Sequence, residues 1–237
     1  MPVVPVVSLT VRQFRRLTPR ARLLTLELAG AAFRFVAGQS ALLGRSDLKE
    51  RKPYSMASAP EDATLGGVLE FIVATDGSGQ PGRHLDAVRG GSVVTVEGPI
   101  GSFKFPPRVT APQLLFIAGG TGIAPVRSMI RHAIASGYSG RITLAYSART
   151  DRDFAVLPEL RRLSRGGQLE LVLTATRDAS ARWHGERRRF TATRLRTLVA
   201  DRRTLCFVCG PASLIAGVPP RLAEAGVTAN RIRVERW

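Results

Sequence analysis

The spacing Gly120-x-Gly122-x-x-Pro125 directly follows the apolar run 114–118. Five successive apolar residues are typical of a strand buried on both faces, and glycine permits the tight turn that follows. Apolar residues then recur at helical spacing over 126–134, and Pro125 suits the first turn of that helix. The helix N-terminus offers bare N–H groups and a positive dipole end, which favour a phosphate. The spacing is close to a dinucleotide fingerprint, and the alternative is an ordinary strand-to-helix turn.

A second stretch whose residue types could take part in binding or catalysis is 51–58. It places two cations, an aromatic ring and two hydroxyls within eight residues. The face of Tyr54 can stack on a flat ring, and the hydroxyl of Ser55 beside it can bond a ring nitrogen. Arg51 and Lys52 add positive charge just upstream. Taken alone, the stretch also fits an ordinary strand with basic surface residues.

The two cysteines, Cys206 and Cys209, have the spacing of a redox pair. Both lie in an apolar, strand-like run, which favours buried structural thiols. Two cysteines cannot supply a four-cysteine iron–sulfur site. No paired acid–base carboxylates and no metal-ligand cluster are evident, so we expect no metal site.

The chain has 237 residues, of which 35 are basic and 18 acidic, giving a formal net charge of +17. Such a charge favours acidic proteins, nucleic acid or anionic membranes as partners. No helix-turn-helix, zinc-finger or RNP pattern is evident, so a nucleic-acid partner is not expected. No apolar run approaches the about 18 residues of a membrane span, and the N-terminal stretch does not resemble a signal peptide. We expect a soluble, cytoplasmic protein.

The elements needed to position these residues change in character along the chain. Short β-rich runs punctuated by turn residues predict an antiparallel barrel or sandwich up to about residue 105; these runs are 24–28, 33–35, 69–73 and 93–96. Three prolines in 105–112 indicate a linker. Strands and helices then alternate, which predicts a doubly wound parallel sheet. The predicted strands are 114–118, 141–147, 169–175 and 204–209, and the predicted helices are 125–135, 157–164 and 191–199.

Five motifs, in this order along nearly the whole chain, resemble those of the ferredoxin–NADP⁺ reductase superfamily. They are Tyr54-Ser55 preceded by cations, Gly98-Pro99-x-Gly101-x-Phe103, the turn 119–125, Cys209-Gly210-Pro211 and Glu235-Arg236-Trp237. The resemblance implies two domains: an antiparallel Greek-key β-barrel that binds FAD over 1–107, and an α/β doubly wound parallel sheet that binds NAD(P) over 112–237.

The resemblance also implies roles in flavin binding. Tyr54 would stack on the isoalloxazine, Ser55 would lie near its reactive nitrogen, and Lys52 stands where the family has an arginine for the FAD pyrophosphate. The loop 79–85 aligns with a second phosphate-binding turn, in which Gly82 replaces a hydroxyl residue and His84 is expected to be structural or on the surface. The implied FAD-binding residues are Arg51, Lys52, Pro53, Tyr54, Ser55, Gly79, Gly82, Arg83 and Trp237.

For the nicotinamide dinucleotide, the resemblance places Cys209 near the carbon that gives the hydride. Thr176-Arg177 resembles a pair that holds the 2′-phosphate, so NADP is expected and NAD remains possible. The implied catalytic residues are Ser55, Cys209 and Glu235. The implied dinucleotide-binding residues are Gly120, Thr121, Gly122, Pro125, Arg149, Thr176, Arg177, Cys209, Gly210 and Pro211.

These roles imply an FAD-dependent oxidoreductase that passes electrons from NAD(P)H to a separate, acidic carrier protein such as a ferredoxin or flavodoxin. Because the plant-type iron–sulfur cysteine spacing is absent, no fused ferredoxin module is expected. An alternative is a reductase of free flavins or quinones. An alternative of another class, suggested by the charge alone, is a basic nucleic-acid-binding or regulatory protein.

Overall fold

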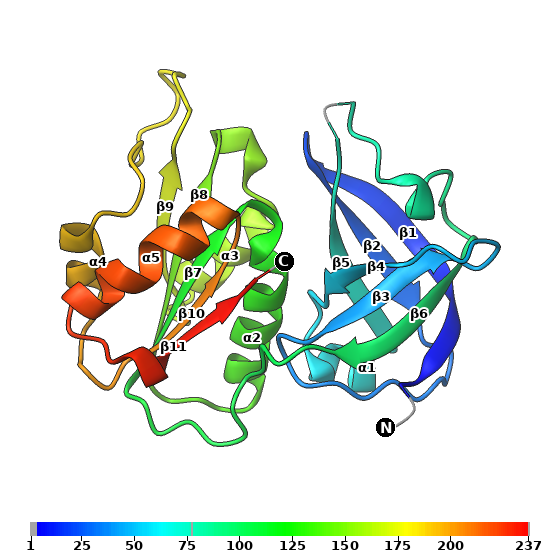
Figure 1. Ribbon diagram of the computed structural model, residues 1–237, viewed down its shortest axis with the longest axis horizontal. Helices are drawn as coiled ribbons and strands as arrows, with labels where there is room; N and C mark the ends of the chain where they lie inside the picture. Colours follow the sequence, from blue (N-terminus) through cyan, green and yellow to red (C-terminus); the bar gives the residue numbers. More distant parts are fainter. Residues whose placement is uncertain (1–3, 77, 237) are drawn as a thin grey trace. The chain divides into compact units, whose positions relative to one another are not determined.

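The computed structural model describes residues 4–76 and 78–236, and the chain divides into two compact units (Figure 1). The first unit contains the chain up to Phe105 together with Arg127–Ser136. The second unit contains Pro106–Val126 and the chain from Gly137 onward. Helix α2 (Ile123–Ala135) therefore contributes its first turn to the second unit and its remainder to the first.

The first unit is built on a six-stranded antiparallel sheet of order β4-β3-β6-β1-β2-β5. A bridge between Met56 and Phe71 and a hydrogen bond from Ala57 N to Glu70 O (2.7 Å) join its two edges, so the sheet closes on itself. The predicted antiparallel Greek-key barrel is confirmed. Its strands are β1 (Val6–Thr18), β2 (Ala21–Glu27), β3 (Ser40–Arg45), β4 (Lys52–Ser55), β5 (Val68–Ala74) and β6 (Val93–Ile100).

The strand predicted at 33–35 is wrong, because residues 31–36 form no ladder. Phe33 and Phe35 are nonetheless buried in the barrel core. The alternation of apolar and polar residues over 33–35 reflects which side chains are buried in the core. It does not require that the segment pair with another strand. Positive φ values at Ala29 and Gly30 turn the chain out of β2 just before this segment.

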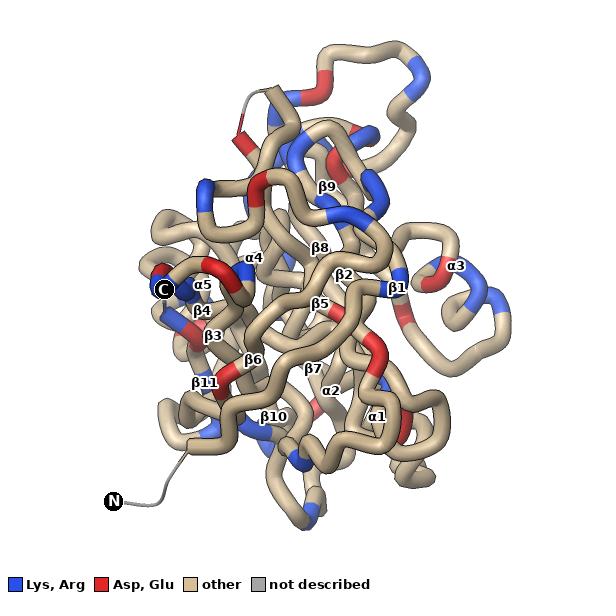
Figure 2. The backbone as a smooth tube through the Cα atoms, turned by 90° about the vertical axis from the view of Figure 1, so that its right-hand side faces the viewer, with Lys and Arg blue, Asp and Glu red and all other residues tan. Residues whose placement is uncertain are grey.

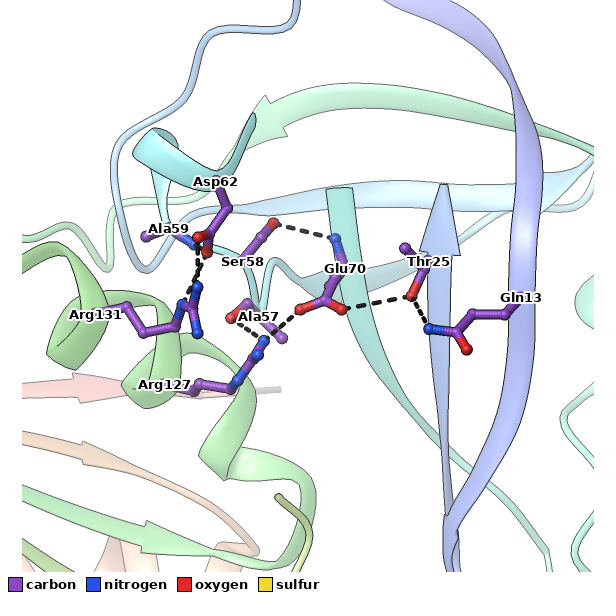
Figure 3. A network of polar contacts seen from close by, with 9 residues as sticks. All are labelled: Gln13, Thr25, Ala57, Ser58, Ala59, Asp62, Glu70, Arg127 and Arg131. Carbon is purple, nitrogen blue, oxygen red and sulfur yellow. Dashed lines mark hydrogen bonds and ion pairs between the residues drawn. The ribbon is translucent and has the colours of Figure 1, made fainter. Parts of the chain in front are cut away.

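Three basic side chains of α2 bind carboxylates of the first unit, and Figure 3 shows the contacts of Arg127 and Arg131. Arg127, which is only 6% exposed, donates to Glu70 Oε2 (2.7 Å) and to Ala57 O (2.8 Å). Arg131 pairs with Asp62 and His132 with Glu61, both on helix α1 (Pro60–Gly66). A buried guanidinium needs such a partner, because an unpaired buried charge is strongly destabilising. These contacts explain why 127–136 groups with the barrel.

The second unit is a five-stranded parallel sheet of order β11-β10-β7-β8-β9. Its strands are β7 (Gln113–Gly119), β8 (Arg141–Ala148), β9 (Glu170–Ala175), β10 (Leu205–Cys209) and β11 (Ile232–Glu235), and its other helices are α3 (Leu157–Arg165), α4 (Ala192–Leu198) and α5 (Ala212–Glu224). The predicted doubly wound parallel sheet is confirmed. The order of the strands reverses between β7 and β10, which makes their carboxyl ends the topological switch point.

One face of this sheet packs against α4 and α5. Leu115, Ile117 and Val208 of the strands are buried in one cluster with Leu195 of α4 and Leu222 of α5. The sequence patterns did not predict α5 or β11. Pro219 and Pro220 interrupt the helical pattern of α5, and β11 has only four residues.

Candidate functional site

The turns that follow β7 and β10 approach each other so closely that only glycine fits between them. A Cβ atom at Gly122 would lie 2.4 Å from Cys209 O, and one at Gly119 would lie 2.7 Å from Pro211 Cδ. A Cβ at Gly210 would lie 2.9 Å from Gly119 N. This contact is at the carboxyl edge of the sheet, at the switch point where open α/β sheets bind ligands.

Tyr146 of β8 holds the glycine turn in place through the hydrogen bonds of its phenol. Its phenol donates a hydrogen bond to Gly120 O (2.9 Å) and accepts one from Ala155 N (3.1 Å). Burial raises the pKa of Tyr146, so the phenol keeps the proton that it donates. The sequence patterns predicted Tyr146 only as part of the strand 141–147. A tyrosine within this largely apolar strand was the available signal, since a buried phenol usually finds a polar partner.

Cys209 and Glu235 are partners in the parallel register of β10 and β11. Cys209 is 1% exposed, and its pKa is raised to about 12 by burial and by the charge of Glu235. Burial also raises the pKa of Glu235 to about 7. The thiol is therefore neutral at physiological pH, which does not suit a nucleophile. Cys206 and Cys209 are free thiols, as expected. The role expected for Trp237 falls on a residue outside the described ranges.

Arg149 and Arg177 lie together where β8 and β9 end. Arg177 N donates to Arg149 O (2.8 Å), and Thr176 donates to Ala148 O through both its amide (2.9 Å) and its hydroxyl (3.2 Å). Both arginines are exposed, and within 4–76 and 78–236 neither guanidinium has a hydrogen-bond or ion-pair partner. Two unpaired guanidinium groups on one edge suit an anion.

Two acidic residues near these arginines accept hydrogen bonds from the backbone. Asp178 accepts hydrogen bonds from Asp151 N and Ser180 N (both 2.7 Å), which lower its pKa. Asp153 accepts from the amide and hydroxyl of Thr150. The carboxylates of Asp153 and Asp178 therefore shape the loops around the two arginines.

In the first unit, Tyr54 lies on β4 opposite Ala41 of β3. Its hydroxyl is 2.8 Å from His84 Nε2, and the two rings stack with centroids 5.6 Å apart. Burial raises the pKa of Tyr54 to about 12. Burial, aided by the charge of Lys52, lowers the pKa of His84. His84 is buried and bonded, so it is structural rather than on the surface.

The two cations before Tyr54 differ in their surroundings. Arg51 forms an ion pair with Glu97 of β6 (2.7 Å), whereas Lys52 is exposed and lies 3.3 Å from Glu50. A Cβ built on Gly82 would lie 3.8 Å from Lys52 Nζ. The structure therefore brings Lys52, and not Arg51, to the Gly82 turn.

The remaining flavin-side residues are held by the backbone of the barrel. Pro53 lies on the edge strand β4, where its missing N–H is tolerated. Ser55 is buried and its hydroxyl accepts a hydrogen bond from Ser40 (3.3 Å). Gly79 has a φ of +82°, in a turn held by Asp76. Arg83 is exposed.

Residues of both units fit the groups that the sequence implies. Among the described residues, no atom lies within 4 Å of a Cβ built at Gly120, so a pyrophosphate can approach the backbone of the glycine turn there. In the first unit, the buried His84 Nδ1 has no hydrogen-bond partner within the described residues and borders Gly82. No three metal-ligating side chains come together in the described part of the chain. None of its helices is long and apolar enough to cross a membrane.

Two family models match this chain: the oxidoreductase FAD-binding domain over residues 8–105 and the oxidoreductase NAD-binding domain over residues 116–219. Among solved structures, the fold matches a ferredoxin NADP⁺ reductase from Neisseria gonorrhoeae with bound FAD and NADP. The TM-score is 0.80 at 19% identity, over 97% of this chain and 98% of that one.

The chain is also similar to the reductase component of the naphthalene 1,2-dioxygenase system of Pseudomonas putida. The identity is 33% over 133 residues, which cover 56% of this chain and 39% of that relative. A longer match is with ferredoxin–NADP reductase B of Sorangium cellulosum (strain So ce56), at 30% identity over 234 residues and 94% of both chains. These findings confirm an oxidoreductase with FAD-binding and NAD-binding domains, against the nucleic-acid alternative. With both cofactor domains and this full-length similarity, the chain belongs to the ferredoxin–NADP reductase family.

Proposed function

We propose that this protein takes electrons from NADPH through FAD and delivers them to a separate, acidic carrier protein of the ferredoxin or flavodoxin type. The observation that carries the proposal is the unpaired pair Arg149 and Arg177, on the same carboxyl edge of the sheet as the glycine turn. That edge combines a close backbone approach for a pyrophosphate with positive charge for a further phosphate.

On the dinucleotide side, the backbone of Gly120, Thr121 and Gly122 approaches the pyrophosphate, over the N-terminal turn of α2 that contains Pro125. Gly210 and Pro211 form the opposite wall of the same contact. Thr176 fixes the strand end from which Arg177 reaches the 2′-phosphate. An NAD-selecting site would instead offer a carboxylate, and the nearby Asp153 and Asp178 accept backbone hydrogen bonds.

On the flavin side, Tyr54 stacks on the ring, Ser55 lies near its reactive nitrogen, and Lys52 pairs with the pyrophosphate. Gly79, Gly82 and Arg83 belong to the second phosphate-binding turn. Arg51 and Pro53 hold the backbone next to Tyr54 in place. When bound, FAD accepts a hydride from the dinucleotide and releases electrons singly. The protein contributes positioning and electrostatics.

Cys209 and Glu235 form the nicotinamide end of the second unit. A neutral, buried thiol at Cys209 packs against the ring without competing for the hydride. Glu235, with a pKa of about 7, can hold or release a proton at neutral pH. We also propose that Trp237 covers the flavin ring. The FAD-binding domain is proposed to span residues 1–107 and the NAD(P)-binding domain residues 112–237.

The proposal that the carrier protein is acidic rests on the positive net charge of this chain. The formal net charge is +17, and Lys and Arg positions recur along the backbone of both units (Figure 2). Such a field steers an acidic protein, and its effect weakens over a Debye length of about 10 Å at 0.1 M salt. The name of the Sorangium relative supports a ferredoxin. A soluble carrier and a soluble reductase are consistent with a cytoplasmic location.

The test of NADPH selection is kcat/KM for NADPH and NADH in the wild type and in Arg177→Ala. The wild type should prefer NADPH. The substitution should cost NADPH about 1.5–3 kcal/mol, the worth of charge-assisted hydrogen bonds, and leave NADH nearly unchanged. Arg202→Ala is the matched control, because Arg202 is also exposed but precedes β10 at the amino edge of the sheet. A wild type that favours NADH, or equal losses for both nucleotides, would contradict the proposal.

A further inference from the structure

His84 is a buried residue with one satisfied and one unsatisfied ring nitrogen. It is 1% exposed, in the short turn Arg83–Leu85, and its Nε2 lies 2.8 Å from Tyr54 Oη. Its Nδ1 is buried and has no hydrogen-bond partner within the described residues. A buried polar atom without a partner is destabilising, so it calls for an explanation such as a ligand atom.

The unsatisfied nitrogen lies beside Gly82, where a side chain would crowd the ring. A Cβ at Gly82 would lie 3.1 Å from His84 Nδ1 and 3.8 Å from Lys52 Nζ. Gly82 has a φ of −63°, which any residue adopts, so the backbone does not require glycine there. Glycine keeps the Nδ1 edge of the imidazole free of a side-chain contact, near an ammonium group and at a position that is itself exposed.

The bond between Tyr54 Oη and His84 Nε2 admits two tautomers of the imidazole, because a phenol can donate or accept. Nδ1 carries the proton in the tautomer in which Tyr54 donates to Nε2. The raised pKa of Tyr54 keeps its hydroxyl protonated, and the lowered pKa of His84 keeps the imidazole neutral. A neutral imidazole has one N–H, so if Nε2 accepts from the phenol, Nδ1 is the donor. A donor beside the Lys52 ammonium suits a phosphate oxygen. Glu50 is 3.3 Å from Lys52, and Asp86 is held by Arg45 (2.8 Å).

We propose that His84 is a phosphate ligand for the flavin dinucleotide, donating from Nδ1 while Nε2 holds Tyr54 in place. One imidazole would then link the ring-stacking residue to the phosphate turn. It would also supply the donor that a hydroxyl residue at position 82 would otherwise provide. The inference rests on the proposed placement of FAD beside β4.

The test compares the affinity of the apoprotein for FAD with its affinity for riboflavin, which has the ring but no phosphate. In His84→Gln the amide takes the place of Nε2, so the contact with Tyr54 is kept and the donor at Nδ1 is lost. In His84→Asn the amide takes the place of Nδ1, so the donor is kept and the contact with Tyr54 is lost. His184→Gln is the control, because His184 is an exposed histidine of the second unit.

His84→Gln should weaken FAD about tenfold or more, the size of one charge-assisted hydrogen bond, and leave riboflavin nearly unchanged. His84→Asn should weaken riboflavin while keeping a ratio of FAD to riboflavin affinity near that of the wild type. In His84→Ala the ratio should fall, and adding Gly82→Ser should restore part of it. The control should change neither affinity.

Two results would overturn the inference. One is a His84→Gln protein whose affinities for FAD and riboflavin fall by the same factor, since that is the signature of a purely structural histidine. The other is a His84→Gln protein whose affinities for FAD and riboflavin both match those of the wild type. Either outcome leaves the proposed function standing if the wild type binds FAD. A wild type that binds no FAD would instead overturn both.

Discussion

The two proposed cofactor sites of this molecule are built by different means. In the second unit, Gly119, Gly122 and Gly210 bring two turns together, and a Cβ atom at any of them would lie within 3.0 Å of a neighbouring atom. In the first unit, side chains make the site, with Tyr54, His84 and Lys52 gathered around Gly82. A site made by backbone approach fixes the residue type, whereas a site made by side chains can replace one donor by another.

This difference accounts for where the chain departs from the pattern that its family resemblance implies. Both departures, Lys52 for an arginine and Gly82 for a hydroxyl residue, lie in the first unit. There a neighbouring side chain can supply the missing charge or donor. The glycine turn of the second unit keeps its spacing, because a backbone clash has no such compensation.

The largest expected effect is that of Gly122→Ala, which places a methyl group 2.4 Å from the backbone carbonyl of Cys209. Overpacking against backbone should cost about 3 kcal/mol of unfolding free energy, and NADPH affinity should fall roughly a hundredfold. FAD affinity should be retained, because the flavin residues lie in the other unit. Thermal unfolding and titrations with each cofactor measure these effects. Gly166→Ala is the control, with its nearest atom at 3.4 Å. If the affinities for NADPH and FAD fell by the same factor, the two sites would not be independent of each other, contrary to this account.

The next effect concerns Glu235, whose pKa is raised from 4.5 to about 7 by burial. The folded protein keeps this proton between those pH values while the unfolded chain releases it. The resulting stability is fully present below pH 4.5 and is lost as the pH rises through about 7. Glu235→Gln should therefore be more stable than the wild type by up to roughly 3 kcal/mol at pH 8 and similar to it at low pH. The difference in Tm across the pH range is the measurement, and a difference independent of pH would be contrary to this account.

Tyr54→Ala should weaken FAD by about 1–3 kcal/mol, because the stacking surface is lost. Tyr54→Phe keeps the ring and removes only the bond to His84, so it should cost about 1 kcal/mol. Retention of FAD through gel filtration and a direct titration would measure both. NADPH affinity should be unchanged in either variant. If Tyr54→Ala binds FAD as tightly as the wild type, Tyr54 does not stack on the flavin.

The smallest effect is expected for Tyr146→Phe, which removes the hydrogen bond to Gly120 O while keeping the buried ring. We expect a loss of about 1 kcal/mol in NADPH binding and none in FAD binding. Tyr138→Phe is the matched control, since Tyr138 also donates to a backbone carbonyl, that of Ala111 (2.8 Å), away from the glycine turn. A similar change in NADPH binding for both variants would show that Tyr146 has no special role in holding the turn.

Local patterns were enough to predict an antiparallel barrel or sandwich followed by a doubly wound parallel sheet, and the family resemblance narrowed the first to a Greek-key barrel. The apolar run of β7, the glycines after it and the alternation that follows all reflect interactions within a few residues. The segment 33–35 was misassigned because alternation reports burial and not pairing. Helix α5 was missed because Pro219 and Pro220 break the periodicity that marks a helix.

The sites were predictable where backbone geometry makes them and less so where distant side chains do. The glycine turn and the strand-end arginines follow from sequence spacing. The bonds of Tyr54 to His84, of Arg51 to Glu97 and of Tyr146 to Gly120 join residues 30, 46 and 26 positions apart. No local pattern specifies such partners, because they depend on strand register and turn position.

The central claim is that one chain carries electrons from NADPH to FAD. Its most direct test is the absorbance of the purified protein under anaerobic conditions, before and after NADPH is added. We predict a yellow protein whose flavin absorbance is bleached rapidly by NADPH and more slowly by NADH, and recovers when an oxidised ferredoxin is supplied. A colourless protein that takes up no FAD, or a yellow protein that NADPH does not bleach, would contradict the account.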